Sequence, residues 1–184
     1  MVDFVAVTGD QMQQETMDSA TIRSYRPDDQ KDVSQLYLEG LLAGQIAPDD
    51  TGADIENIAE AYFSNERSHL WVATINDRTV GMIAVAQEPG HAAEIRRLRV
   101  DRAYQATSIA AELVETALRH CQTHGYLKVV FDTRIDPQSG PDAIVEVFDR
   151  FGFQHTRTKA TADKELHEFY LDLYRQRGPE VDSS

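Results

Sequence analysis

The segment from Ala93 to Ala110, AEIRRLRVDRAYQATSIA, constrains the fold more than any other part of the chain. It predicts a strand that breaks into a tight turn and opens a helix, because helical apolar spacing starts at Ile109. The apolar stripe of that helix consists of Ile109, Leu113, Val114, Ala117, Leu118 and Cys121. Since the stripe begins inside the turn, the helix N-terminus points outward, where its free N–H groups attract anions such as phosphate.

This strand, turn and helix resemble the core motif of the GNAT family of N-acetyltransferases, in which the turn binds the pyrophosphate of acetyl-CoA. The resemblance implies cofactor-binding residues at Leu98, Arg99, Val100, Gln105, Ala106, Thr107, Ser108, Ile109 and Ala110. That family's loop has two glycines, where this chain has Ala106 and Ser108. A residue with a Cβ held in a left-handed conformation costs about 1 to 2 kcal/mol, which would weaken acetyl-CoA binding without abolishing it.

The order of the expected elements agrees with this resemblance, which implies an α+β fold with a mixed sheet of about seven strands flanked by about four helices. The expected strands are residues 21–25, 70–75, 80–86, 93–100, 128–132, 153–158 and 166–173. The expected helices run from Asp28 to Gly44, from Asp54 to Ser64, from Ile109 to Gly125 and from Pro141 to Gly152. With 184 residues and 41% hydrophobic content, one domain is expected at 21–173, with an extension at 1–20 and a tail at 174–184.

Charge and composition exclude several classes of partner. The net charge of −13 opposes binding to nucleic acid and favours approach of a cationic amine, although such charge is also typical of a solvated surface. No apolar run approaches the roughly 20 residues that span a bilayer, so no membrane partner is expected. The single cysteine, Cys121, excludes an intramolecular disulfide, and the lack of a secretory signal predicts a cytoplasmic location. A homodimer stays open.

Four arginines stand within seven residues beside the expected phosphate loop: Arg96, Arg97, Arg99 and Arg102. They would give a locally positive field that helps to hold a polyanionic cofactor. Alternatively, they only pair with the many acidic residues of the chain.

Acetyl transfer to an amine requires a base for the amine, a polarised thioester carbonyl and a proton for the leaving thiolate. The resemblance assigns the base to Glu94 and the carbonyl to the backbone N–H groups of Leu98 and Val100, which a β-bulge would free. If Glu94 is partly buried among Trp71, Met82 and other apolar residues, its pKa would be raised. The alternative for Glu94 is an exposed carboxylate paired with Arg96 or Arg97.

The position of the family's usual proton-donating tyrosine, four residues before Gly152, holds Phe148, which cannot donate a proton. Phe148 is most simply a core residue at helical spacing, and Tyr104, Tyr126 or water could replace the tyrosine. The asparagine that opens that helix in the family corresponds to Pro141. His120 and His124 flank Cys121 at a spacing that imitates metal ligands, but Cys121 belongs to the buried stripe, so no metal is expected.

Two functions from different classes agree with the sequence. The first is an N-acetyltransferase that moves an acetyl group from acetyl-CoA directly to an amine of a small molecule or a protein. The second, favoured by the absent glycines and tyrosine, is a non-catalytic acyl-CoA-binding or protein-interaction module on the same fold.

Overall fold

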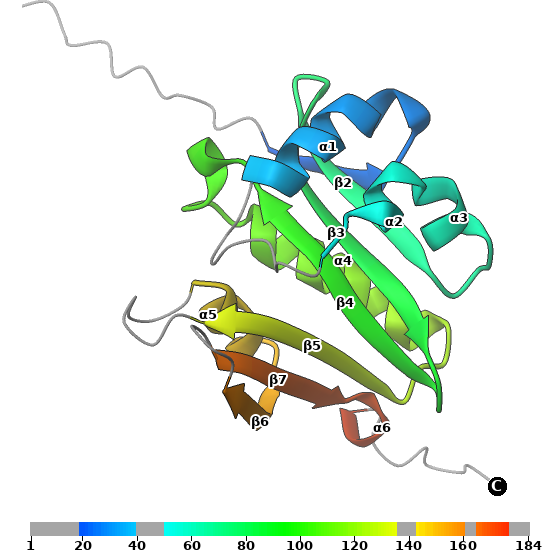
Figure 1. The fold of residues 1–184 in the computed structure, drawn as a ribbon, viewed down its shortest axis with the longest axis vertical. Coiled ribbons are helices and arrows are strands. Elements are labelled where there is room, and N and C mark those ends of the chain that lie inside the picture. Colours follow the sequence, from blue (N-terminus) through cyan, green and yellow to red (C-terminus); the bar gives the residue numbers. More distant parts are fainter. Residues whose placement is uncertain (1–18, 40–49, 136–142, 161–164, 177–184) are drawn as a thin grey trace, which may run out of the picture.

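The computed structural model describes residues 19–39, 50–135, 143–160 and 165–176, and it has a seven-stranded mixed sheet with helices on both faces (Figure 1). The strands are β1 (Thr21–Ser24), β2 (His69–Ile75), β3 (Arg78–Glu88), β4 (Ala92–Val100), β5 (Lys128–Ile135), β6 (Gln154–Ala160) and β7 (Glu165–Asp172). Their order in the sheet is β1-β2-β3-β4-β5-β7-β6. All neighbours are antiparallel except β4 and β5, which are joined through the long helix between them. The α+β fold with seven strands is therefore confirmed.

Six α-helices lie in the described residues, two more than expected. They are α1 (Gln30–Glu39), α2 (Ala53–Glu56), α3 (Ile58–Phe63), α4 (Ile109–Thr123), α5 (Ala143–Asp149) and α6 (Leu173–Gln176), with 3₁₀ turns η1 (Pro27–Asp29) and η2 (Arg102–Tyr104). The helix expected at 54–64 is divided because Asn57 leaves the helical region, with φ −129° and ψ 53°. The second extra helix, α6, occupies the start of the expected tail. The expected helix end at Gly44 and helix start at Pro141 lie outside the described residues.

The helices form two layers, one on each face of the sheet (Figure 1). Helices α4 and α5 cover one face in a large apolar cluster that includes Leu98, Leu113 and the fully buried Phe148. Helices α1 to α3 cover the other face in a smaller cluster that includes Val33, Tyr62 and Met82. The prediction that Phe148 is a core residue is confirmed. None of the described helices is long and apolar enough to cross a membrane.

A glycine on β3 lets the start of α4 approach the sheet closely. A Cβ on Gly81 would lie 3.1 Å from Ile109 Cγ2 and 3.1 Å from Leu113 Cδ1, closer than most Cβ contacts. The first turn of α4 is therefore pressed against β3. This packing fixes the position of the loop that precedes α4.

Strand β4 carries the bulge that the sequence analysis predicted. Met82 pairs with Arg99 and Ala84 pairs with Arg96, so one residue of β3 opposes both Arg97 and Leu98. Arg97 has a positive φ of 58°, as expected for a bulged strand. Pairing between β4 and β5 stops after Glu94 and Val130, and beyond that pair the two strands diverge (Figure 1). We call this point, where β4 and β5 separate, the fork.

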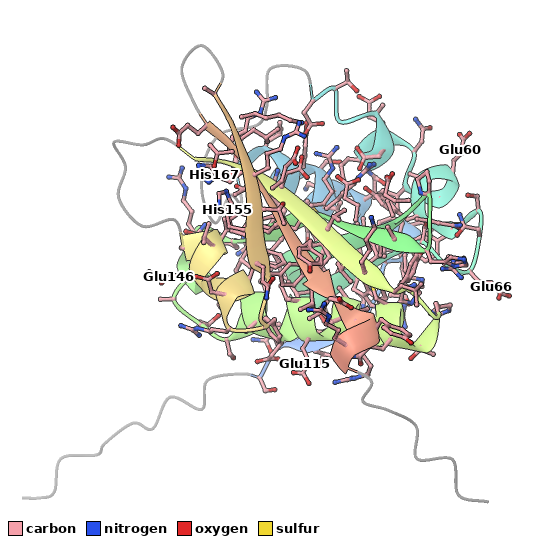
Figure 2. The ribbon with its side chains drawn as sticks, turned by 90° about the horizontal axis from the view of Figure 1, so that it is seen from below. Glu60, Glu66, Glu115, Glu146, His155 and His167 are labelled. Atoms are coloured by element: carbon pink, nitrogen blue, oxygen red, sulfur yellow. The ribbon has the colours of Figure 1, made fainter. Side chains whose placement is uncertain are left out.

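Many acidic side chains lie on the solvated surface. Glu60 of α3, Glu66 after α3, Glu115 of α4 and Glu146 of α5 are exposed and project outward in Figure 2. This distribution accords with the interpretation of the net charge as a solvated surface.

Candidate active site

Glu94 lies at the fork, where it pairs in register with Ala86 of β3 and Val130 of β5. Its side chain is 21% exposed and accepts a hydrogen bond from Arg96 Nε at 2.5 Å. The expected apolar surroundings are wrong, because Met82 pairs with Arg99 at the other end of β4 and Trp71 belongs to the cluster on the α4 face. The pairing with Arg96 that the alternative named is present, but the carboxylate is half-buried and not exposed as that alternative expected.

A second carboxylate, Asp132 of β5, lies near Glu94 and was missed by the sequence analysis. Asp132 pairs with Glu168 of β7, two residues beyond the last β4–β5 pair. Partial desolvation, followed by the negative charges of Glu94 and Glu168, raises the pKa of Asp132. A single carboxylate directly after the apolar run of β5 was the available signal in the sequence. That signal did not show that Asp132 would lie near Glu94 of β4.

Arg97, at the bulge, is bound by two aspartates from the segment around the start of α2. Its Nε donates to Asp54 Oδ2 at 2.8 Å, and its Nη2 donates to Asp50 Oδ1 at 2.9 Å. The ring of Tyr37 lies 5.1 Å from the guanidinium carbon, and the hydroxyl of Tyr62 donates to Asp54. Hydrogen bonds from Arg97 lower the pKa of Asp50. Burial opposes the charge of Asp54, but the bonds from Arg97 and Tyr62 outweigh it and lower that pKa as well.

The contacts of Arg97 offset the strain of its backbone. A non-glycine residue in the left-handed region costs about 1 to 2 kcal/mol, so this conformation persists only where the surroundings impose it. The side chain of Arg97 is 13% exposed and is held by both aspartates. The bulge and the α2 segment are therefore one connected unit.

Three of the four arginines expected beside the phosphate loop, Arg96, Arg97 and Arg99, are not gathered around it. Arg96 binds Glu88 and Glu94, and Arg97 binds Asp50 and Asp54. The register places Arg96 beside Ala84 and Arg99 beside Met82, residues of the cluster under α1 to α3. The side chains of Arg96 and Arg99 thus face away from α4, and a cofactor contact from Arg99 stays a prediction for its backbone alone.

The predicted phosphate loop has no left-handed residue. The positive-φ residues of the described chain do not include any position from Gln105 to Ala110, and Ser108 has φ −74°. The expected strain from the absent glycines is therefore wrong, because the loop adopts a conformation open to any residue. Ser108 Oγ donates to Glu112 at 2.5 Å, and the hydroxyl of Thr107 accepts from Ile109 N–H at 3.4 Å.

Two backbone donors remain free at the start of α4. The first intrahelical bond runs from Glu112 N–H to Ser108 O at 3.0 Å. The preceding N–H groups of Ala110 and Ala111 have no hydrogen-bond partner among the residues that the structure describes. These donors lie at the positive end of a helix of 15 residues, where an anion is favoured, and binding of a phosphate there stays a prediction.

Phe148, at the position of the family's usual tyrosine, is packed in the core. The Phe148 ring stacks on Phe131 at 3.9 Å and meets Phe153 edge-on at 5.0 Å. Tyr126 is fully buried, and its hydroxyl donates to Arg67 O at 2.9 Å, so it is occupied elsewhere. Tyr104 is the nearest tyrosine in sequence to the phosphate loop, in η2.

The histidines around Cys121 are bound to the backbone. His120 Nε2 lies 2.9 Å from Arg67 O, and His124 Nδ1 lies 2.9 Å from His120 O. Burial raises the pKa of the Cys121 thiol to about 12, which disfavours the thiolate that binds metals. In the described ranges, no three His, Cys, Asp or Glu side chains are grouped to hold a metal ion.

A sequence match to a known family covers the bulge, the fork and the free N-terminus of α4. Residues 46–168 match the family model of the acetyltransferase (GNAT) domain. The chain belongs to the GNAT acetyltransferase family. This match extends from the segment before α2 into β7, and it confirms the resemblance inferred from the strand, turn and helix.

Two relatives match part of this chain, and the name of one of them is N-acetyltransferase 8. The N-acetylaspartate synthetase of Mus musculus is 29% identical over 103 residues, which cover 55% of this GNAT chain and 33% of that protein. N-acetyltransferase 8 of Homo sapiens is 31% identical over 85 residues, which cover 44% of this chain and 37% of that protein. The chain thus matches about a third of the length of these relatives.

Solved GNAT structures share the fold. A proposed acetyltransferase from Salmonella typhimurium, solved with its cofactor acetyl-CoA, aligns with a TM-score of 0.69 at 18% identity, covering 88% of this chain and 98% of its own. The ribosomal-protein-S18-alanine N-acetyltransferase of Escherichia coli aligns with a TM-score of 0.62 at 16% identity, covering 84% and 94%. Likeness at these identities concerns the fold alone.

Proposed function

We propose that this chain is an acetyl-CoA-dependent N-acetyltransferase that transfers the acetyl group directly to an amine of a small molecule or a protein. The observation that carries this proposal is the bulge at Arg97 and Leu98, placed beside the edge of β4 that β5 leaves free beyond Glu94. A non-catalytic module would not require a carboxylate at that fork. The names of the matched relatives also favour the enzyme.

The residues around the start of α4 fit the phosphates of acetyl-CoA. Ala110 and Ala111 offer free N–H groups, and Ala106 and Ser108 are small. Because no residue of the loop is left-handed, glycine is not required for its conformation. Its two side chains can still reduce the room near a phosphate, so we expect weaker binding than a glycine loop would give.

Acetyl-CoA supplies an acetyl group that is already activated as a thioester. The chain supplies the rest: Glu94 accepts the proton of the acceptor amine, and the N–H groups of Leu98 and Val100 donate to the thioester carbonyl oxygen. Asp132 is a second candidate for the base, because its pKa is raised and Glu94 lies nearby. Because Phe148 is buried between two other phenylalanines, the thiolate takes its proton from Tyr104 or from solvent.

Two measurements test this proposal. First, acetyl-CoA at 100 times its Kd should stabilise the protein by about 2.7 kcal/mol, seen as a rise in melting temperature. Second, Glu94→Gln should keep that rise but lower kcat by about 10² to 10⁴ with a panel of amines, the usual contribution of a general base.

Glu88→Gln is the matched control, because Arg96 binds Glu88 as well as Glu94. It should reduce kcat far less than Glu94→Gln does. Asp132→Asn, measured in parallel, separates the two candidate bases. Full activity of both Glu94→Gln and Asp132→Asn would remove the carboxylates from the mechanism, and no rise in melting temperature with millimolar acetyl-CoA would contradict the function itself.

A further inference from the structure

Arg99 differs from the other arginines of β4 because no carboxylate neutralises it within the described chain. Its Nη1 donates to Leu98 O at 2.9 Å, a bond to the neighbouring residue. Its Nε is buried and has no hydrogen-bond partner there. Buried donors are satisfied in most folded proteins, and a buried cation without a counter-ion is costly. The guanidinium of Arg99 therefore lacks a counter-ion among the described residues.

The surroundings of Arg99 further disfavour its positive charge. Burial, followed by the positive charge of Arg97, lowers the pKa of Arg99 to about 10. Asp50 and Asp54 are the nearest source of negative charge, but their oxygens bind Arg97. The two described carboxylates that act on Arg99 are thus already bound to Arg97.

The position of Arg99 indicates which ligand could supply a carboxylate to it. It pairs with Met82, whose side chain lies in the cluster under α1 to α3, whereas the free N–H groups of α4 lie on the other face. The phosphates of the donor are therefore expected on the opposite face from the Arg99 side chain. Glu94 pairs with Ala86 and Arg99 pairs with Met82, which are four residues apart on β3. Residues an even number of positions apart on a strand share a face, so Glu94 and Arg99 lie on the same face.

This face has opposite charges at its two ends. Glu94 and Asp132 lie at the fork, and Arg99 lies beyond the bulge. The rise of an extended strand puts the Cα atoms of Glu94 and Arg99 about 15 Å apart, a span that the two side chains shorten. A small molecule with an ammonium group and a carboxylate would be bound at both ends.

We propose that Arg99 binds a carboxylate of the acceptor, so that the acceptors are amino acids or similar small amines that carry a carboxylate. This inference rests on the proposed acetyl transfer, since it names the class of amine. The planar guanidinium can form two parallel hydrogen bonds to a carboxylate, one of them from the Nε that lacks a partner. The same contact would place the amine toward Glu94.

The test compares acceptors that differ only in this charge. Initial rates are measured with L-alanine, L-aspartate and L-glutamate and with their amides, for the wild type and Arg99→Gln. We expect Arg99→Gln to lower the ratio of kcat/KM for acid over amide by about 10- to 100-fold, mainly through KM, since hydrogen bonds to charged groups are of that strength. The acids and the amides differ in the basicity of their amines, but this difference is the same for both proteins and cancels when the two ratios are compared. Arg99→Lys should restore part of the ratio because it keeps the charge.

Arg96→Gln is the control, because Arg96 lies on the same strand and face but is bound to Glu88 and Glu94. Whatever it does to the rate, it should leave the acid-to-amide ratio within about twofold, less than one hydrogen bond to a charged group is worth. An unchanged ratio in Arg99→Gln would overturn the proposal. So would a loss of acetyl-CoA binding in Arg99→Gln with the ratio retained, because Arg99 would then serve the donor.

A binding measurement separates this inference from the proposed function. The melting temperature is measured with CoA present and either succinate or succinamide added. We expect succinate alone to raise it, in the wild type and not in Arg99→Gln. If no amine is acetylated but this shift is seen, acetyl transfer fails and the carboxylate site stands. If amines are acetylated but the ratio is unchanged and succinate gives no shift, the carboxylate site fails and acetyl transfer stands.

Discussion

The two faces of the sheet around β4 are built from the same strand but by different chemistry. On the α4 face, Ile95, Leu98 and Val100 are buried among apolar side chains. On the α1 to α3 face, Glu94, Arg97 and Arg99 are partly buried, and Arg97 is held by Asp50 and Asp54. The stability of the first face depends on the apolar area that it buries. The stability of the second face depends on specific pairs of charged side chains.

The bulge makes this division possible. Without an extra residue, the alternation of β4 would place Arg97 on the apolar face, since consecutive residues of a strand point to opposite faces. Because Arg97 and Leu98 together oppose one residue of β3, Arg97 stays with Arg96 and Leu98 returns to the core. The same bulge thus gathers Arg96, Arg97 and Arg99 on the α1 to α3 face.

The apolar face should show the largest loss of stability on mutation. Phe148→Ala removes a fully buried ring that stacks on Phe131 and meets Phe153. We expect a loss of about 3 to 5 kcal/mol in the free energy of unfolding, measured with urea. Phe63→Ala is the control, because Phe63 is 38% exposed and should lose much less. Equal losses would show that the α4 face is not the main source of stability.

The charged face should respond next, and with an unusual order of variants. Arg97→Ala leaves Asp50 and Asp54 without their partner and should cost about 2 to 4 kcal/mol, less than a fully buried pair because some solvent reaches it. Arg97→Gly loses the same ion pairs but relieves the positive φ, so it should be more stable than Arg97→Ala by about 1 kcal/mol. In an ordinary strand, glycine is the less stable of the two. That ordinary order would contradict a strained bulge held by Arg97.

The sequence was sufficient for features that depend on neighbouring residues. Apolar periodicity predicted the seven strands, the turn before α4 and the core position of Phe148. It could not predict that Arg97 binds Asp50 and Asp54, residues more than forty positions away, because alternation assigns a face and not a partner. The prediction of apolar surroundings for Glu94 was wrong for the same reason. Asp132 reaches Glu94 only through the parallel pairing of β4 with β5.

A glycine at the start of α2 tests how closely the charged face is packed. Gly52 has φ 67°, and a Cβ there would lie 2.9 Å from Tyr37 Cε1, in the ring that stacks near Arg97. Gly52→Ala should lower the free energy of unfolding by about 1 to 2 kcal/mol, from strain and displacement of the ring. Gly90→Ala is matched, since Gly90 has φ 72° with nothing within 4 Å. Equal losses at both positions would mean that Tyr37 moves without cost.

Acid should destabilise the two faces in different pH ranges, because each holds a different kind of titrating group. On the α4 face, His69 packs 4.5 Å from Trp71 and 5.7 Å from His120. Burial, followed by the nearby His120 and His124, lowers the pKa of His69 to about 4, and burial also lowers that of His120. The unfolded chain, with histidine pKa values of about 6.5, then binds protons first, so stability falls as the pH drops from about 6.5 toward 4.

On the charged face, the lowered pKa values of Asp50 and Asp54 give stability that is present above their unfolded value and lost below it, at about pH 4 and under. Between pH 6.5 and 4.5 the loss therefore belongs to the histidines. We expect it to amount to about 1 kcal/mol, after allowance for partial exposure, and to shrink in the double variant His69→Gln, His120→Gln. Urea unfolding at pH 7 and pH 5 gives the comparison. If the double variant loses as much stability as the wild type over that range, the protonation of buried histidines is not what weakens the α4 face, and the charged face must titrate earlier than its ion pairs imply.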